Sequence, residues 1–205
     1  MTSKTEEAAH EATHQGTQNK KIALFISVLA LFLAVSETLG KSAQTAALSD
    51  NVEASNLWAF FQAKTIRRTL VETAAQEMAI QAIAVTQEET KTAMAKQIDA
   101  WQKTGQRYRS EPRKGPHGEE LGEGSEELSK RAIKAQSKRD LALAQYHHFE
   151  VSSAAFQIAI VLASASIIAS LNALVWVSAA SGFGGLVIAG LGQFAPLAFN
   201  LFGGH

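Results

Sequence analysis

The segment from Val151 to Phe202 most limits what this chain can fold into, because it contains no Asp, Glu, Lys or Arg. About 20 apolar residues suffice for a helix to cross the hydrocarbon core of a bilayer, so this segment is too long for one crossing. We predict a membrane-spanning helix at 151–176, and over 177–205 a turn in the glycine-containing stretch 178–185 followed by another membrane-spanning helix. The alternative is one span and a glycine-rich re-entrant segment, which lipid disfavours because irregular backbone leaves polar groups unpaired.

A second apolar segment, Ile22–Val35, follows Lys20 and Lys21 and predicts another span over residues 21–40. A cleaved signal peptide is the alternative, because the apolar run is short and Ala34-Val35-Ser36 has the spacing of a cleavage site. We favour a retained helix, since the polar tail of residues 1–20 is long for a signal peptide.

Residues 41–150 hold most of the charged residues and are expected to fold outside the bilayer. Lys41–Thr104 contains neither glycine nor proline, which favours long helices, and its broad apolar coverage predicts several helical neighbours. A polar loop is expected at 105–125, followed by a helix capped by Ser125 that runs into the second span. An unbroken outgoing helix would outrun the return path, so we predict a break in Thr86–Thr90.

These elements predict an all-α membrane protein with three transmembrane helices and an extramembrane helical bundle or coiled-coil hairpin between the first and second. Its orientation is ambiguous, because Lys20 and Lys21 favour an N-terminus inside, whereas the larger basic cluster at 130–139 favours the extramembrane domain inside. We follow the larger cluster and predict a cytoplasmic domain.

Composition argues against several functional classes. Lys and Arg total 19, as do Asp and Glu, so no basic excess indicates nucleic acid as a partner. The absence of cysteine excludes disulfides and thiolate chemistry. His10, Glu11 and His14 match the zinc-protease pattern H-E-x-x-H, but they lie in a polar tail without a third ligand, and chance is the preferred explanation. We expect no metal, no cofactor and no enzymatic activity.

Polar side chains at membrane depth are the other candidate sites, because such groups usually face a cavity, a partner or water. An interfacial position is the simpler explanation for Glu37, and interhelical hydrogen bonding for the amides; the four residues are Glu37, Gln157, Asn172 and Gln193. Amphipathic rings near the predicted membrane boundaries are expected to anchor there; these are Trp58, Tyr146, His147, His148 and Trp176. Small residues at four-residue spacing predict close helix packing; these are Ala155, Ala159, Ala163, Gly185 and Ala189.

Several stretches resemble the bacterial membrane-protein family known as domain of unknown function 4337. They are Trp58–Lys64 with Ile66, Lys138–Asp140, Tyr146–Phe149 and Phe156–Ser164. The resemblance implies a bacterial plasma (inner) membrane location and supplies no activity, substrate or catalytic residue.

Three functions follow in order of preference. The first is a homo-oligomeric membrane scaffold or interaction protein whose partners are lipids and copies of itself. The second is a channel or transporter component in which the four polar residues at membrane depth line a path between subunits. The third is a membrane hydrolase using the H-E-x-x-H residues.

Overall fold

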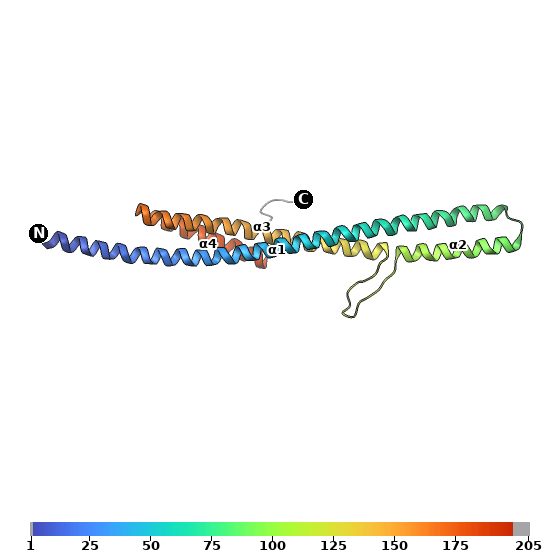
Figure 1. Ribbon diagram of the computed structural model, residues 1–205, viewed down its shortest axis with the longest axis horizontal. Coiled ribbons are helices and arrows are strands. Elements are labelled where there is room, and N and C mark those ends of the chain that lie inside the picture. The colour runs from blue at the N-terminus through green and yellow to red at the C-terminus, as the bar shows by residue number, and fades with distance from the viewer. Residues whose placement is uncertain (1, 199–205) are drawn as a thin grey trace. The chain divides into compact units, whose positions relative to one another are not determined.

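The computed structural model describes residues 2–198, and the side chains of residues 19–198. Every regular element in this range is an α-helix (Figure 1), and the elements are α1 (Thr2–Ala84), α2 (Glu88–Arg109), α3 (Ser125–Ala169) and α4 (Asn172–Phe194). The predicted all-α class is therefore confirmed. Three of these helices, α1, α3 and α4, contain stretches long and apolar enough to cross a membrane.

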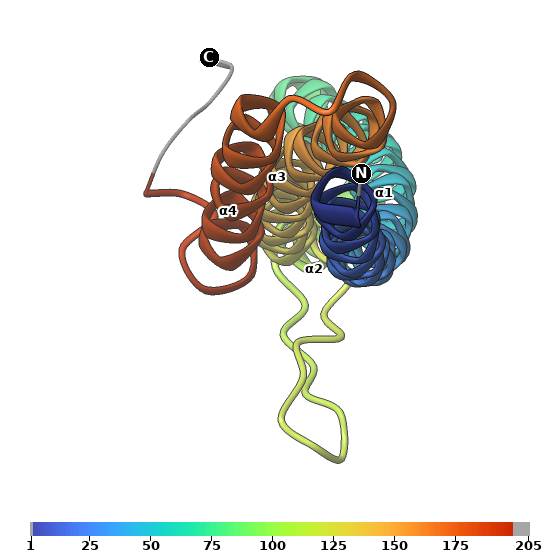
Figure 2. The same cartoon turned by 90° about the vertical axis from the view of Figure 1, so that its left-hand side faces the viewer.

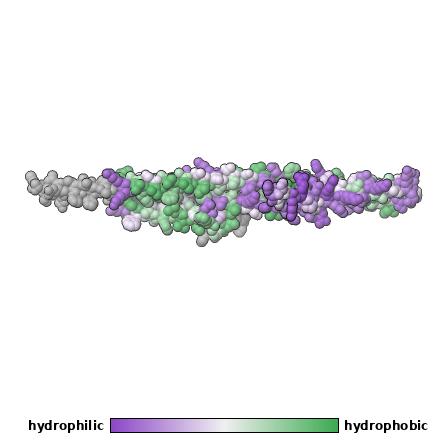
Figure 3. Space-filling model, turned by 90° about the horizontal axis from the view of Figure 1, so that it is seen from below, coloured by the Kyte–Doolittle hydropathy of each residue, from purple (hydrophilic) through white to green (hydrophobic). Residues whose placement is uncertain are grey.

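The chain divides into two compact units. The apolar unit comprises residues 1–47 and 140–205, and the polar unit comprises Leu48–Arg139. Figure 3 shows where hydrophobic and hydrophilic side chains gather on one face of the molecule. Each unit has its own small core, and each is described separately below.

The apolar unit packs the first part of α1, the second part of α3 and all of α4 together (Figure 2). Its core centres on Leu29, Phe156 and Ala159, with Phe32 stacked on Phe156 at a ring-centroid distance of 6.0 Å. In the most apolar stretches of α1 and α4, 17% of the residues are buried within the chain. Most of this apolar surface is therefore left for another medium to cover.

The predicted turn at 178–185 is wrong, and so is the predicted end of the second span at residue 176, because α3 ends at Ala169 and α4 begins at Asn172. Residues 178–185 lie inside α4, and the reversal occurs at Ser170 and Leu171, where Ser170 has a φ of 54°. The glycines do not mark the turn, because glycine occurs both in turns and where helices pack closely. Gly182 and Gly185 face Leu29 and the Phe156 ring, so they admit neighbouring side chains instead of reversing the chain.

Serine hydroxyls join the helices of the apolar unit. Ser178 and Ser181 of α4 donate to the carbonyls of Ala159 and Ala155 of α3, at 2.6 and 3.0 Å. Ser152 of α3 donates in the other direction, to the carbonyl of Gly185 at 2.8 Å. Such short contacts to a neighbouring backbone require closely approaching helices, as the spacing of small residues predicts.

In the polar unit, α2 runs back along α1 after a short break. Residues 85–87 separate the two helices, which confirms the predicted break; Glu88–Thr90 already belong to α2. Gly105 lies against Val71 and Glu72, while the Lys64 ammonium lies 5.3 Å from the centre of the Tyr108 ring. The later residue of α2, Tyr108, thus contacts the earlier residue of α1, Lys64, so the two helices are antiparallel.

One seam of α1 is buried or half-buried in the polar unit. Its members recur at alternating spacings of three and four residues, as in a coiled coil, and are Ala54, Leu57, Phe61, Lys64, Arg68, Val71, Ala75 and Met78. Leu57 and Ala54 pack against Leu128 and Ala132 of α3. The neighbours predicted from broad apolar coverage, α2 and α3, therefore lie along this one seam.

The polar loop is shorter than predicted, because α2 continues through Gly105 to Arg109. Gly105 stays helical since its missing side chain leaves room for Glu72. The following helix begins at Ser125, as predicted, but the Ser125 hydroxyl donates to the carbonyl of Arg109 at 3.3 Å. From Ser125 the helix continues without interruption to Ala169.

Candidate functional site

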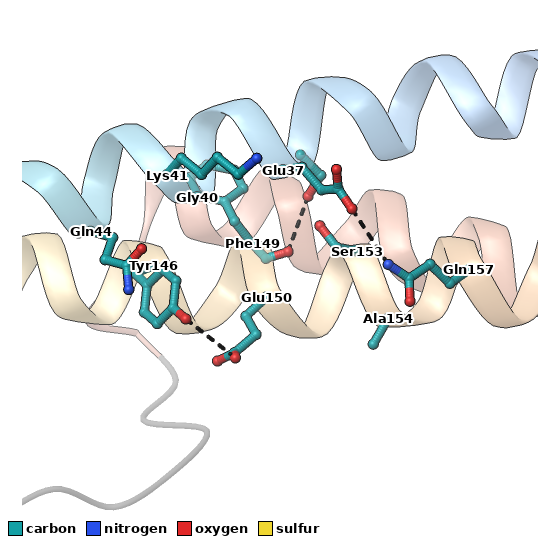
Figure 4. Close-up of a pocket in the computed structure, with 11 residues that line it drawn as sticks. Glu37, Gly40, Lys41, Gln44, Tyr146, Phe149, Glu150, Ser153, Ala154 and Gln157 are labelled. Carbon is teal, nitrogen blue, oxygen red and sulfur yellow. Dashed lines mark hydrogen bonds between the residues drawn. The ribbon is translucent and has the colours of Figure 1, made fainter.

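An open groove of about 420 Å³ lies on the apolar unit between α1 and α3 (Figure 4). We call it the interhelical groove. It is lined from α1 by Ser36, Glu37, Gly40, Lys41 and Gln44, and from α3 by Tyr146, Phe149, Glu150, Ser153, Ala154 and Gln157. Charged groups and small residues alternate along it, so it combines a polar rim with space beside the helix backbones.

Small residues on α1 bring the two helices together along this groove. A side chain at Gly40 would lie 3.3 Å from the Phe149 Cβ, so glycine allows the close approach. The buried Ser36 hydroxyl donates to the Phe149 carbonyl at 3.1 Å. These two contacts hold α1 and α3 in register at the level of the charged side chains.

Glu37 and Gln157 meet across the groove. The Gln157 amide nitrogen donates to a Glu37 carboxylate oxygen at 3.4 Å (Figure 4). Lys41 lies one helical turn beyond Glu37 and lines the same groove, yet it forms no ion pair with any described residue within 4.0 Å. The groove therefore holds a carboxylate and an ammonium that are not neutralised by direct contact with each other.

Glu150 supplies a second carboxylate to the lining of the groove. The Tyr146 hydroxyl donates to it at 3.3 Å, and His147 lies 3.6 Å from its other oxygen. Both contacts come from one face of α3, at spacings of four and three residues. Glu150 is thereby held beside the groove.

Two of the four polar residues predicted at membrane depth come together, and two do not. Glu37 and Gln157 share the groove, as described above. Asn172 lines a different pocket of about 390 Å³ at the α3–α4 turn, with Lys21, Phe25 and Trp176 among its neighbours. Gln193 is exposed near the end of α4. Within one chain, these residues do not line a common path.

The predicted anchors have different surroundings. Trp176 is 78% exposed on the apolar unit, and Tyr146 and His147 flank Glu150, so anchoring remains a prediction for these three. His148 is instead buried, with Nδ1 2.8 Å from the Ala144 carbonyl and the ring beside Gly192.

Trp58 also differs from the predicted headgroup anchors. It belongs to the polar unit, where it meets the Phe61 ring edge-on at a centroid distance of 5.3 Å. Both rings pack against the small core formed around Leu57 and Leu128. The structure therefore gives Trp58 a packing role within the polar unit.

The loop at 110–124 is pinned at its base. Arg109 pairs with Glu126 at 2.8 Å, and Glu127 accepts hydrogen bonds from the Ser110 hydroxyl and the Glu111 amide. Burial acts to raise the pKa of Glu127, but these hydrogen bonds outweigh it and hold the pKa below its ordinary value. The folded loop therefore favours a charged Glu127.

Sequence reasoning missed Lys41, Gln44 and Glu150 as groove residues. They flank the apolar stretches and have the composition of ordinary polar surface residues. The available signal was spacing, since Lys41 follows Glu37 by one helical turn and lies on the same face of α1. No sequence signal pairs that face with Glu150, because the register between α1 and α3 depends on how the chain returns.

No group of three His, Asp or Glu side chains suited to a metal ion occurs within residues 19–198. The side chains of the metal candidates His10 and His14, and of Glu11 between them, lie outside the described residues.

The helices and the groove define an all-helical protein with three helices long and apolar enough to cross a membrane. The chain matches the family described as Domain of unknown function (DUF4337) over residues 18–195. It belongs to this family, as the resembling stretches imply. No curated protein and no solved structure matches the chain.

Proposed function

We propose that the protein is a homo-oligomeric scaffold of the bacterial inner membrane, with the polar unit on the cytoplasmic side and no enzymatic activity. The observation that carries the proposal is a second apolar stripe on α1 that no described part of the chain covers. Membrane insertion is supported separately by the three apolar helices and their largely uncovered surfaces.

The second stripe lies on the face of α1 opposite the buried seam. Its large members are between 58% and 69% exposed and are Leu48, Val52, Ile66, Leu70 and Ile80. Ala59 and Ala63 lie on the same face, which also carries the exposed polar side chains of Ser55, Gln62, Thr73 and Glu77. Isolated exposed apolar residues are common, but an apolar row along one helix face is typical of a protein contact.

The outer face of α2 provides an internal comparison. This helix belongs to the same unit, yet it has no exposed large apolar side chain. Apart from alanines, its exposed side chains are polar or charged; they include Glu89, Thr92, Lys96, Asp99 and Lys103. Because α2 shows the composition expected of a helix facing water, the apolar stripe on α1 is not a general property of the unit. A second copy offers the same stripe, so two stripes can pack against each other as a self-complementary contact.

The test is the mass of the purified full chain in mild detergent, with and without a charge on the stripe. Leu70→Glu is expected to convert the oligomer to monomer, because pairing would bury an unpaired carboxylate. Thr92→Glu adds the same charge to the outer face of α2 and should leave the mass unchanged. Wild-type protein that is monomeric at all concentrations overturns the proposal.

A channel or transporter component is the second candidate. The Glu37–Gln157 contact favours it, since both side chains are exposed and available to a path formed between subunits. The separate positions of Asn172 and Gln193 weigh against it. Ion flux into vesicles that is lost in Glu37→Gln would support this function over a purely structural one.

A further inference from the structure

We propose that the interhelical groove binds a phospholipid with a primary-amine headgroup, as in phosphatidylethanolamine. This inference rests on the membrane insertion proposed above and does not depend on the oligomeric state. It deepens the proposal by naming the lipid chemistry that the groove recognises.

The position of the groove suits a headgroup. Lys21 and Lys41 are separated along α1 by a rise of roughly 30 Å, which is the thickness of a hydrocarbon core. Glu150 and the turn at Ser170 are separated along α3 by about the same rise. Both helices therefore place the end of the groove that holds Lys41 and Glu150 at a hydrocarbon boundary.

The charges match the two halves of such a headgroup. The Lys41 ammonium has no carboxylate partner among the described residues, so it is available to a lipid phosphate. Glu37, about 6 Å deeper, receives one long hydrogen bond from Gln157. It and Glu150 can accept hydrogen bonds from a primary ammonium, which offers three N–H donors.

The surface below the groove suits an acyl chain. Val161 follows Gln157 by one turn on the same face of α3 and is 65% exposed. On α1, Ala34 lies about one turn before Glu37 and is also exposed. The groove thus has polar groups near the hydrocarbon boundary and an exposed apolar strip on its hydrocarbon side. A phospholipid has the matching arrangement of a polar headgroup and an acyl chain.

A choline headgroup separates amine recognition from simple phosphate binding. Phosphatidylcholine carries the same phosphate, but its quaternary ammonium has no N–H donor, and phosphatidylglycerol carries no amine. A groove that reads the amine retains phosphatidylethanolamine over both. A groove that reads only the phosphate through Lys41 retains all three.

The experiment is native mass spectrometry of the full chain incubated in detergent with equal amounts of these three lipids. We expect wild-type protein to retain phosphatidylethanolamine about tenfold over phosphatidylcholine. Glu37→Gln and Glu150→Gln should each reduce that ratio severalfold, and Lys41→Gln should lower the retention of all three lipids. Glu53→Gln, an exposed position of α1 in the polar unit, should leave the ratio unchanged.

Equal retention of the ethanolamine and choline lipids by wild-type protein overturns this inference, as does a preference for phosphatidylglycerol. If Glu37→Gln lowers the oligomer mass without changing the lipid ratio, the groove binds a second copy of the chain, and the lipid inference is also overturned. Failure of the scaffold proposal looks different, because monomeric protein can still show the lipid preference. Protein that stays soluble without detergent refutes membrane insertion itself.

Discussion

Gly192 and Gly190 of α4 offer a matched test of how tightly the apolar unit is packed. A Cβ at Gly192 would lie 2.6 Å from the Cβ of His148, far inside the 3.5–4.0 Å of a normal carbon contact. His148 is 2% exposed, and its Cβ is fixed to the backbone of α3, so it cannot move aside alone. A Cβ at Gly190 would meet no atom within 4 Å.

The same substitution should therefore have opposite effects at the two positions. Alanine favours a helix over glycine by up to about 1 kcal/mol, and Gly190→Ala should gain some of this. At Gly192 an overpacking cost of about 1–3 kcal/mol opposes that gain, so Gly192→Ala should destabilise the unit by up to about 2 kcal/mol. The difference between the variants amounts to about tenfold or more in the unfolding equilibrium.

The assay is unfolding of the purified chain in mild detergent by added sodium dodecyl sulfate, followed by tryptophan fluorescence. Gly192→Ala should shift the midpoint to lower denaturant than wild type, and Gly190→Ala should shift it to the same or higher denaturant. Equal midpoints for the two variants would show that α4 does not pack on α3 at this distance, and the reasoning would fail.

Three further changes probe single contacts. Ser178→Ala removes the 2.6 Å hydrogen bond to the Ala159 carbonyl and should cost about 0.6 kcal/mol, at most about 1.7, in the same unfolding assay. Leu57→Ala opens a cavity in the core of the polar unit and should cost about 2–4 kcal/mol, measured as a lower Tm by circular dichroism. The lowered pKa of Glu127 means that its stabilisation is present above the unfolded pKa of about 4.3 and is lost as pH falls through the folded value. Protection of the 110–124 amides against hydrogen exchange, measured relative to their intrinsic rates at each pH, should fall below about pH 4 in wild type. Glu127→Gln should show lower protection at pH 7 and little further change in acid.

The spans and the break after α1 could be predicted because each depends on a quantity that the sequence carries directly. The absence of charge over 151–202 marks hydrocarbon-compatible helices, and residue counts with a fixed helical rise show that a straight outgoing helix is too long. Neither argument needs to know which residues touch. The structure has three helices long and apolar enough to cross a membrane, and it has the break after α1.

The turn and the groove could not be predicted because they depend on contacts between distant residues. Gly182 and Gly185 read as a turn until Leu29 and Phe156 are known to pack against them. Glu37 reads as an isolated acid until the register of α3 brings Gln157 to it. In both cases a residue's role is set by a partner more than a hundred positions away or in another helix.

The two units also differ in what their exposed apolar side chains imply. On the apolar unit, the proposed membrane insertion would cover exposed residues such as Leu31 and Val161 with hydrocarbon, so they would need no protein partner. The polar unit holds many charged residues and cannot lie in hydrocarbon. Hydrocarbon therefore cannot cover the exposed side chains of Ile66 and Leu70. Membrane insertion thus accounts for one exposed surface and leaves the other unexplained. That remainder, an apolar row on α1 beside a polar α2, is the reason to expect a second copy of the chain along the polar unit.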